Sequence, residues 1–148
     1  MSIEIHDVTK ENENAISQLC VAKEQKRFIE TPEECLQEAK DDLHYHPVGL
    51  YADQQLVGFA MYGFFPHEDE GRVWLDRFLI DAKFQGHGFG KNMLQALITK
   101  LTEEYKCRKI YLSVYEDNPK AIYLYQKFGF QFNGELDVHN EKIMVKAV

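Results

Sequence analysis

The chain has 148 residues, of which 45% are hydrophobic and 13% aromatic. This supplies a core for a single domain over residues 1–148 and argues against a disordered chain. Lys and Arg number 17 against 24 Asp and Glu, so the net charge is −7. Such a balance disfavours nucleic-acid binding, which needs positive charge against the phosphates, and suits a cationic partner.

Cysteine usage and hydropathy indicate the compartment. Cys20, Cys35 and Cys107 are odd in number, far apart and without a C-x-x-C pair, which is typical of a reduced intracellular protein rather than a disulfide framework or zinc site. The chain does not open with a basic region and an apolar stretch, and no apolar run approaches the roughly 18–20 residues that cross a membrane. We therefore expect a cytoplasmic protein that does not bind membranes.

The first half of the chain predicts two helices and four strands. A helix start is clearest at Thr31, where Thr is an N-cap, Pro32 takes the first helical position and Glu34 completes a capping box. The apolar patterns place the helices at Asn12 to about Gln25 and Thr31 to about Asp42. The strands are expected at Ser2–Val8, Val48–Ala52, Leu56–Phe64 and Arg72–Asp81.

The second half alternates helices with strands. Apolar residues recur at helical spacing from Gly88 to Leu101, and a second helix begins with Asn118-Pro119 and ends at Gly129. Strands are expected at Lys109–Tyr115, Phe130–Phe132 and Glu141–Val145, the last two as a hairpin around Asp137–Asn140. The order predicts an α/β (α+β) fold, a mixed and mostly antiparallel central sheet with helices on both faces.

A glycine-rich loop joins the strand at Phe78–Asp81 to the following helix. Gly86, Gly88 and Gly90 let the backbone approach a ligand, and the amides of a helix N-terminus bind anions. The P-loop pattern fails, because Gln85 and Asn92 stand where it requires Gly and Ser or Thr. The dinucleotide pattern fails on glycine spacing. A phosphate site is predicted, with a merely tight strand–helix turn as the alternative.

The segment Gln85-x-x-Gly88-x-Gly90 resembles the Q/R-x-x-G-x-G/A signature of the GNAT acetyltransferases. The resemblance implies acetyl-CoA (coenzyme A) as co-substrate, with the pantetheine arm bound by the backbone of Phe78, Leu79 and Ile80. It also implies that the loop cradles the pyrophosphate. The loop residues are Gln85, Gly86, His87, Gly88, Phe89, Gly90 and Lys91.

A second segment also resembles the GNAT acetyltransferases. Asn118, Ala121, Tyr125, Gly129 and Phe130 match the family pattern N-x-x-A-x-x-x-Y-x-x-x-G-F. By this resemblance the Asn hydrogen-bonds the coenzyme arm and Tyr125 protonates the departing thiolate, a role that a phenol can fill. Tyr123 is the rival, but two residues are about 200° apart on a helix, so both cannot face one sulfur. A half-buried structural tyrosine is the alternative.

Direct attack by an amine needs a general base or a water relay to remove a proton, and Asp76 is the candidate base. Regular alternation along the strand puts Asp76 on one face with Trp74, Phe78 and Ile80, where a carboxylate needs a partner or a function. Asp76 also precedes Gln85 by nine residues, the position of an acidic residue in polyamine-acetylating GNAT enzymes. A salt bridge to a nearby Lys or Arg is the alternative.

Nearly the whole chain resembles bacterial spermine/spermidine acetyltransferases of this family, apart from a shorter loop around His67–Gly71. The resemblance implies a small polycationic amine as substrate, and a homodimer. Glu30 is the best candidate for binding the amine, together with Asp76. Tyr51 or Tyr62 could provide the apolar surface that contacts the methylene groups of the polyamine. The other available acids are Glu33, Glu34, Glu68, Asp69 and Glu70.

Other functions stay open. The enzyme could act on an aminoglycoside, an amino acid or a protein N-terminus, or the chain could be a non-catalytic acyl-CoA sensor. No metal is expected: His44-x-His46 could place two ligands on one strand face, but no third ligand is apparent.

Overall fold

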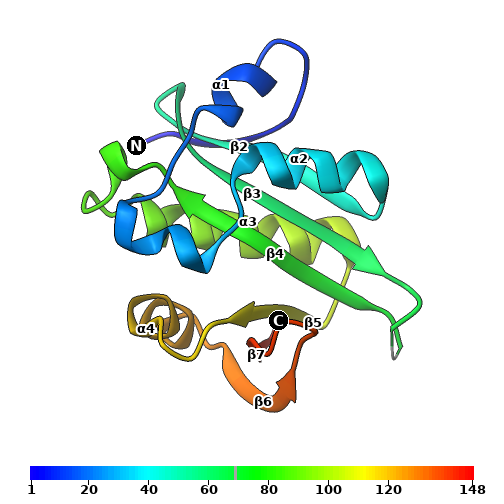
Figure 1. Cartoon of the computed structure of the whole chain (residues 1–148). Coiled ribbons are helices and arrows are strands. Elements are labelled where there is room, and N and C mark those ends of the chain that lie inside the picture. The colour runs from blue at the N-terminus through cyan, green and yellow to red at the C-terminus, as the bar shows by residue number, and fades with distance from the viewer. Residues whose placement is uncertain (69) are drawn as a thin grey trace.

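The computed structural model describes residues 1–68 and 70–148. One seven-stranded sheet organises the fold, with helices on both faces (Figure 1). The strands are β1 (Ile3–Asp7), β2 (Tyr45–Ala52), β3 (Gln55–Phe65), β4 (Arg72–Ile80), β5 (Lys109–Val114), β6 (Gln131–Leu136) and β7 (Lys142–Ala147). The helices are α1 (Glu13–Ser17), α2 (Pro32–Asp41), α3 (Phe89–Tyr105) and α4 (Pro119–Lys127), with 3₁₀ turns η1 (Lys23–Phe28) and η2 (Ala82–Phe84).

The strand order is β1-β2-β3-β4-β5-β7-β6, and every neighbouring pair is antiparallel except β4 and β5. This confirms the predicted mixed, mostly antiparallel sheet. The β2–β3 turn is made by Asp53 and Gln54, both with positive φ, the conformation of a two-residue hairpin turn. The predicted hairpin at the C-terminus is also present, as β6 and β7.

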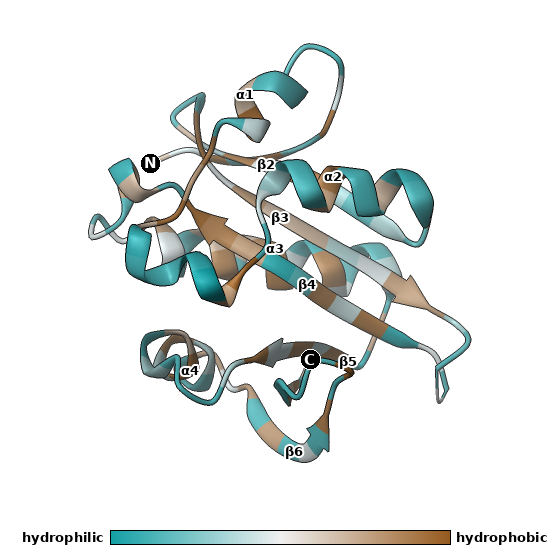
Figure 2. Ribbon diagram, in the orientation of Figure 1, coloured by the Kyte–Doolittle hydropathy of each residue, from teal (hydrophilic) through white to brown (hydrophobic). Residues whose placement is uncertain are grey.

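Two apolar clusters cover the two faces of the sheet. The buried residues of α3, among them Leu94 and Leu97, pack on one face, and α4 lies against the same cluster. Ile16 of α1 and Cys35 of α2 pack on the other face, against Phe59 and other residues of β3. Figure 2 shows the hydrophobic colour on the central strands and hydrophilic colour on the outer side of α2. None of the helices in the described part of the chain could cross a membrane.

The first predicted helix is wrong over its second half. It ends at Ser17, and the chain resumes only as η1. The cause is a tertiary contact: the Cys20 amide donates to the buried Asp81 carboxylate at 3.0 Å, and the Cys20 carbonyl accepts from the Ala82 amide at 2.8 Å. These bonds fasten the chain to the end of β4 and take groups that a continuing helix would use.

A β-bulge in β4 corrects the predicted alternation of side chains. Met61 of β3 pairs with Arg77 and Tyr62 pairs with Leu75, which leaves Asp76 without a partner in this ladder. The extra residue reverses the alternation beyond it. Phe78 and Ile80 therefore pack against the α3 cluster, whereas Trp74 packs in a separate cluster with Phe65. Asp76 does not share a face with Phe78 and Ile80 as regular alternation predicts.

Strands β4 and β5 diverge. Their parallel ladder contains a single pair, Trp74 with Tyr111, whose rings lie 5.4 Å apart. Beyond this pair the strands separate, and residues Leu75–Ile80 of β4 face residues Ser113–Tyr115 across a cavity. The separation leaves backbone groups of β4 available to a ligand.

Candidate active site

A cavity of about 300 Å³ occupies the opening between β4 and β5. It gathers residues from both sequence motifs and from the chain before α2. The predicted site residues that line it are Glu30, Asp76, Phe78, Leu79, Ile80, Gln85, Gly86, Gly90, Asn118 and Tyr125. Four residues that were predicted to bind the coenzyme do not line the cavity: His87, Gly88, Phe89 and Lys91.

The glycine loop fits the approach of a phosphate group. Gly86 and Gly88 have φ of +83° and +82°, and Gly88 is the N-cap of α3. A Cβ atom added at Gly86, Gly88 or Gly90 would meet no atom within 4 Å in the described part of the chain. The glycines therefore keep open space over the first turn of a 17-residue helix, whose leading amides lack intrahelical partners.

Gln85 shapes this loop from the inside. Its Nε2 donates to the Ile80 carbonyl and to the Gln25 side chain, each at 2.8 Å. Gln25 in turn accepts from the Ala22 amide at 3.1 Å. The side chain predicted to lie at the phosphates thus connects the loop to η1, and the loop amides are left to bind the anion.

The second motif contributes Asn118 and Tyr125 from the start and the middle of α4. Pro119 opens the helix as predicted, but the Asn118 side chain makes no capping bond within the described residues and borders the cavity. Burial, with a smaller effect of Glu141, raises the pKa of Tyr125 to about 12. Tyr125 therefore keeps its proton at neutral pH, as an acid requires. Tyr123 is 63% exposed and lies outside the cavity.

Asp76 occupies the bulge of β4 and borders the cavity. Its Oδ2 is buried and accepts no hydrogen bond from residues 1–68 or 70–148. Burial raises the pKa of Asp76 to about 7, against the attraction of Arg77 and with added repulsion from Glu38, Glu68 and Asp42. A carboxylate with a pKa near 7 is suited to accept a proton at neutral pH.

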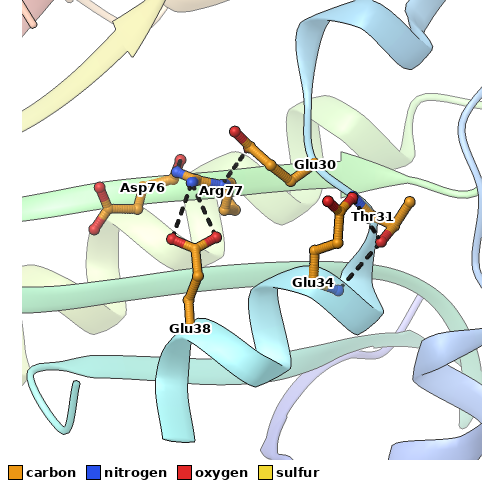
Figure 3. Close-up of polar contacts among 6 residues, drawn as sticks. All are labelled: Glu30, Thr31, Glu34, Glu38, Asp76 and Arg77. Atoms are coloured by element: carbon orange, nitrogen blue, oxygen red, sulfur yellow. Dashed lines mark hydrogen bonds and ion pairs between the residues drawn. The ribbon is translucent and has the colours of Figure 1, made fainter. Parts of the chain in front are cut away.

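Arg77, next to Asp76, is neutralised by acids from outside β4 (Figure 3). Its Nε lies 2.8 Å from Glu30, its NH2 group lies 3.3 Å from Glu38 of α2, and NH1 donates to the Asp76 carbonyl at 2.9 Å. The predicted alternative for Asp76 was a salt bridge, but Arg77 uses Glu30 and Glu38 instead. Arg77 therefore fixes the Glu30 carboxylate at the cavity wall.

The remaining predicted acids lie elsewhere. Glu34 forms the capping box with Thr31, whose hydrogen bonds lower the pKa of Glu34 (Figure 3). Glu68 accepts from the Trp74 indole at 2.6 Å. Glu33 and Glu70 are exposed, and Asp69 lies outside the described residues.

The predicted aromatic walls and histidines also lie outside the cavity. Tyr62 is fully buried, and Tyr51 borders a shallow surface hollow near β1. His44 Nδ1 contacts Asp42 at 2.8 Å and His46 Nε2 contacts Asp7 at 2.7 Å. Among the described residues, no three His, Cys, Asp or Glu side chains are grouped as a metal site would require.

The cavity is also lined by residues that the sequence did not single out, among them Phe28, Tyr115 and Glu141. The Phe28 and Tyr115 rings contact each other with centroids 5.9 Å apart. Burial and the nearby Asp137 and Glu30 raise the pKa of Glu141 to about 7. Glu141 lies between a turn and the first residue of β7, and nothing in its local sequence connects it with α4 or β4.

A sheet that opens between β4 and β5, with a glycine loop leading into α3, is the architecture of a class of transferases that use acyl-CoA. The Acetyltransferase (GNAT) family matches residues 12–130, and the chain belongs to this family.

Among curated proteins the chain is similar to the spermine/spermidine N(1)-acetyltransferase of Bacillus subtilis strain 168, with 58% identity over 152 aligned positions that cover both chains completely. Two solved structures share the fold at 18% identity. One is the spermidine N-acetyltransferase from Vibrio cholerae in complex with CoA and spermine, with a TM-score of 0.72 over 97% of this chain and 92% of that one. The other is an aminoglycoside acetyltransferase in complex with coenzyme A, with a TM-score of 0.81 over 99% and 95%.

Proposed function

We propose that this protein transfers the acetyl group of acetyl-CoA to a primary amine of spermine or spermidine. One observation carries the proposal: a single cavity is bordered by the glycine loop, by Asn118, by protonated Tyr125 and by Asp76. The 58% identity to a spermine/spermidine acetyltransferase over both full lengths supports the choice of amine.

Coenzyme binding is assigned to the open loop and the free edge of β4. The amides at Gly86 to Gly90 would hold the pyrophosphate. Backbone groups of residues 78–80 would hydrogen-bond the pantetheine amides, and the Asn118 side chain would hold the same arm. A β4 amide directed at the thioester carbonyl would stabilise the negative charge that develops during attack.

The chemistry needs one base and one acid. Asp76 removes a proton from the substrate ammonium, and the neutral amine attacks the thioester carbon. The C–S bond then breaks, and the thiolate takes the proton of Tyr125. The nitrogen releases its second proton to water, and water returns one proton to the Tyr125 phenolate. The products are an N-acetylamine, coenzyme A and one released proton, with no covalent enzyme intermediate.

The electrostatics suit a polycation. The chain carries a net charge of −7, and Glu30, Asp76 and Glu141 border the cavity. Arg77 and Lys120 also line the cavity, and Arg77 is shared between Glu30 and Glu38. Glu30 Oε2 faces Arg77, and its second oxygen is the atom we assign to an ammonium group of the substrate.

The test is release of free coenzyme A thiol by the purified protein with spermine, spermidine, putrescine and an aminoglycoside. Turnover concentrated on spermine or spermidine would support the proposal. Turnover on the aminoglycoside alone would make an aminoglycoside, not a polyamine, the substrate. Binding of acetyl-CoA without turnover on any amine would favour a sensor. We further propose that one domain, residues 1–148, acts as a homodimer in the cytoplasm without binding nucleic acid or membranes, which sedimentation and cell fractionation can check.

A further inference from the structure

Glu141 is a cavity acid to which the proposed chemistry assigns no role. It precedes β7 and closes the turn that begins at Asp137. The Glu141 amide donates to the Asp137 carboxylate at 2.9 Å, and the Asp137 amide donates to the Glu141 carbonyl at 2.9 Å. Asn140, with φ of +64°, completes the turn. The main chain therefore fixes the position of Glu141. Burial raises the pKa of the Glu141 carboxylate, and the charge and hydrogen bond of the neighbouring Asp137 carboxylate raise it further.

The Glu141 carboxylate has no cation to offset it. No Lys, Arg or His within residues 1–68 and 70–148 forms a salt bridge with it. Its charged neighbours are mainly acids, Asp137 and Glu30, and burial adds to their effect in raising its pKa to about 7. Against burial and these acids, the positive charge of Arg77 lowers the pKa of Glu141, but Arg77 pairs with Glu30 and Glu38. A half-buried carboxylate among acids is unfavourable unless a cation joins it.

The neighbouring cavity wall is apolar. Phe28 and Tyr115, whose rings contact each other, border the same cavity as Glu141 and Glu30. Aromatic surface beside a carboxylate matches the chemistry of a polyamine, in which methylene chains separate ammonium groups. Asp76 and Tyr125, the base and the acid, border this cavity as well.

We propose that Glu141 is a specificity-determining residue that binds an ammonium group of the polyamine other than the one being acetylated. This inference rests on the proposed polyamine acetyltransferase function. Glu141 then selects amines that carry a second positive charge, while the methylenes between the two nitrogens lie on the Phe28 and Tyr115 rings. The bound ammonium supplies the cation that the empty site lacks.

A different role for Glu141 would act through Tyr125, whose pKa it helps to raise. Loss of Glu141 would then change the chemical step. A substrate-binding role instead changes affinity for the polyamine and leaves turnover at saturation intact. The division of the effect between KM and kcat separates the two roles.

The experiment compares Glu141→Gln with the wild type and with Glu103→Gln, which removes one charge from the exposed surface of α3. The amide keeps the shape of the side chain, and because it relieves repulsion from Asp137 and Glu30 we expect a melting temperature no lower than that of the wild type. Loss of a charge-assisted hydrogen bond should raise the spermidine KM, and the Kd measured by calorimetry with coenzyme A present, about 10- to 100-fold. The kcat and the KM for acetyl-CoA should stay within about twofold, and Glu103→Gln should match the wild type.

An unchanged spermidine KM and Kd, or a loss confined to kcat, would overturn the role of Glu141 while wild-type turnover keeps the proposed function. Wild-type protein that neither acetylates nor binds any polyamine would overturn the proposed function and this inference with it. A Glu141→Gln protein that is misfolded by circular dichroism would overturn the claim that the main chain alone fixes this turn. Glu141→Asp, which keeps the charge on a shorter arm, should recover part of the affinity.

Discussion

Replacing Asp76 with Asn should stabilise the folded protein while it removes the proposed base. The carboxylate is buried in the bulge of β4, and burial raises its pKa from the ordinary 3.8 to about 7. This difference corresponds to roughly 4 kcal/mol of destabilisation by the ionised group. Because the side chain borders a cavity that admits water, we expect roughly 2–4 kcal/mol to be recovered in Asp76→Asn.

The stability that Asp76→Asn gains over the wild type must increase as the pH rises. An acid whose pKa is higher in the folded protein than in the unfolded chain contributes stability at low pH and loses it as the pH rises from about 4 to about 7. Wild-type protein should therefore lose this stability over that interval, and the Asn variant should not. At pH 8 the variant should melt roughly 5–12 °C higher, and at pH 5 the gap should shrink to about a third.

Thermal and urea unfolding at pH 5 and pH 8 measure the difference in stability between the wild type and the Asp76→Asn variant. Glu141, whose pKa is also raised to about 7, is present in both proteins and cancels in their difference. Glu103→Gln controls for loss of one surface charge. The kcat/KM for spermidine at pH 8 should fall about 100-fold or more, the range that loss of a general base produces. A variant that is less stable at pH 8, or a gap that does not change with pH, would refute the assigned burial of this charge, and an unaltered pH–rate profile would refute the base.

Three further substitutions test the other parts of the site. Tyr125→Phe should lower kcat about 100-fold or more and change the Kd of coenzyme A little; unchanged turnover would remove Tyr125 as the acid. Gly90→Val should raise the Kd of coenzyme A at least about tenfold, because its side chain enters the open space over the loop, and should change the free energy of unfolding by no more than about 1 kcal/mol; normal affinity by calorimetry would place the phosphates elsewhere. Glu30→Gln should raise the spermidine KM about 3- to 30-fold and lower the free energy of unfolding by at most about 1 kcal/mol, because Arg77 keeps Glu38; an unaltered KM would exclude Glu30 from substrate binding.

The parts of the fold that local chemistry dictates could be predicted from the sequence. The capping box at Thr31, Pro119 at the start of α4 and the glycines before α3 each act within a few residues of themselves, and all lie where expected. The succession of helices and strands along the chain follows from the same local patterns, because their periods separate helices from strands.

Features that depend on distant contacts could not be predicted. The helix expected beyond Ser17 gives way because Asp81, 61 residues after Cys20, accepts a hydrogen bond from its amide. The bulge at Asp76 results from pairing with β3 and leaves no local pattern. Glu141 reaches the cavity only because β7 inserts between β5 and β6, and that arrangement is a property of the whole sheet.

The bulge also shows how a side chain can be added to a strand without disturbing its neighbours. Asp76 is the one residue of β4 that regular pairing with β3 does not use, so deleting it would restore an unbroken ladder. Leu75 and Arg77 already pair with Tyr62 and Met61, which are consecutive in β3, so the residues on both sides of the bulge would keep their partners and their faces. Phe78 and Ile80 would stay against the α3 cluster. The extra residue therefore places a carboxylate at the cavity while the rest of β4 packs as it would in a regular strand.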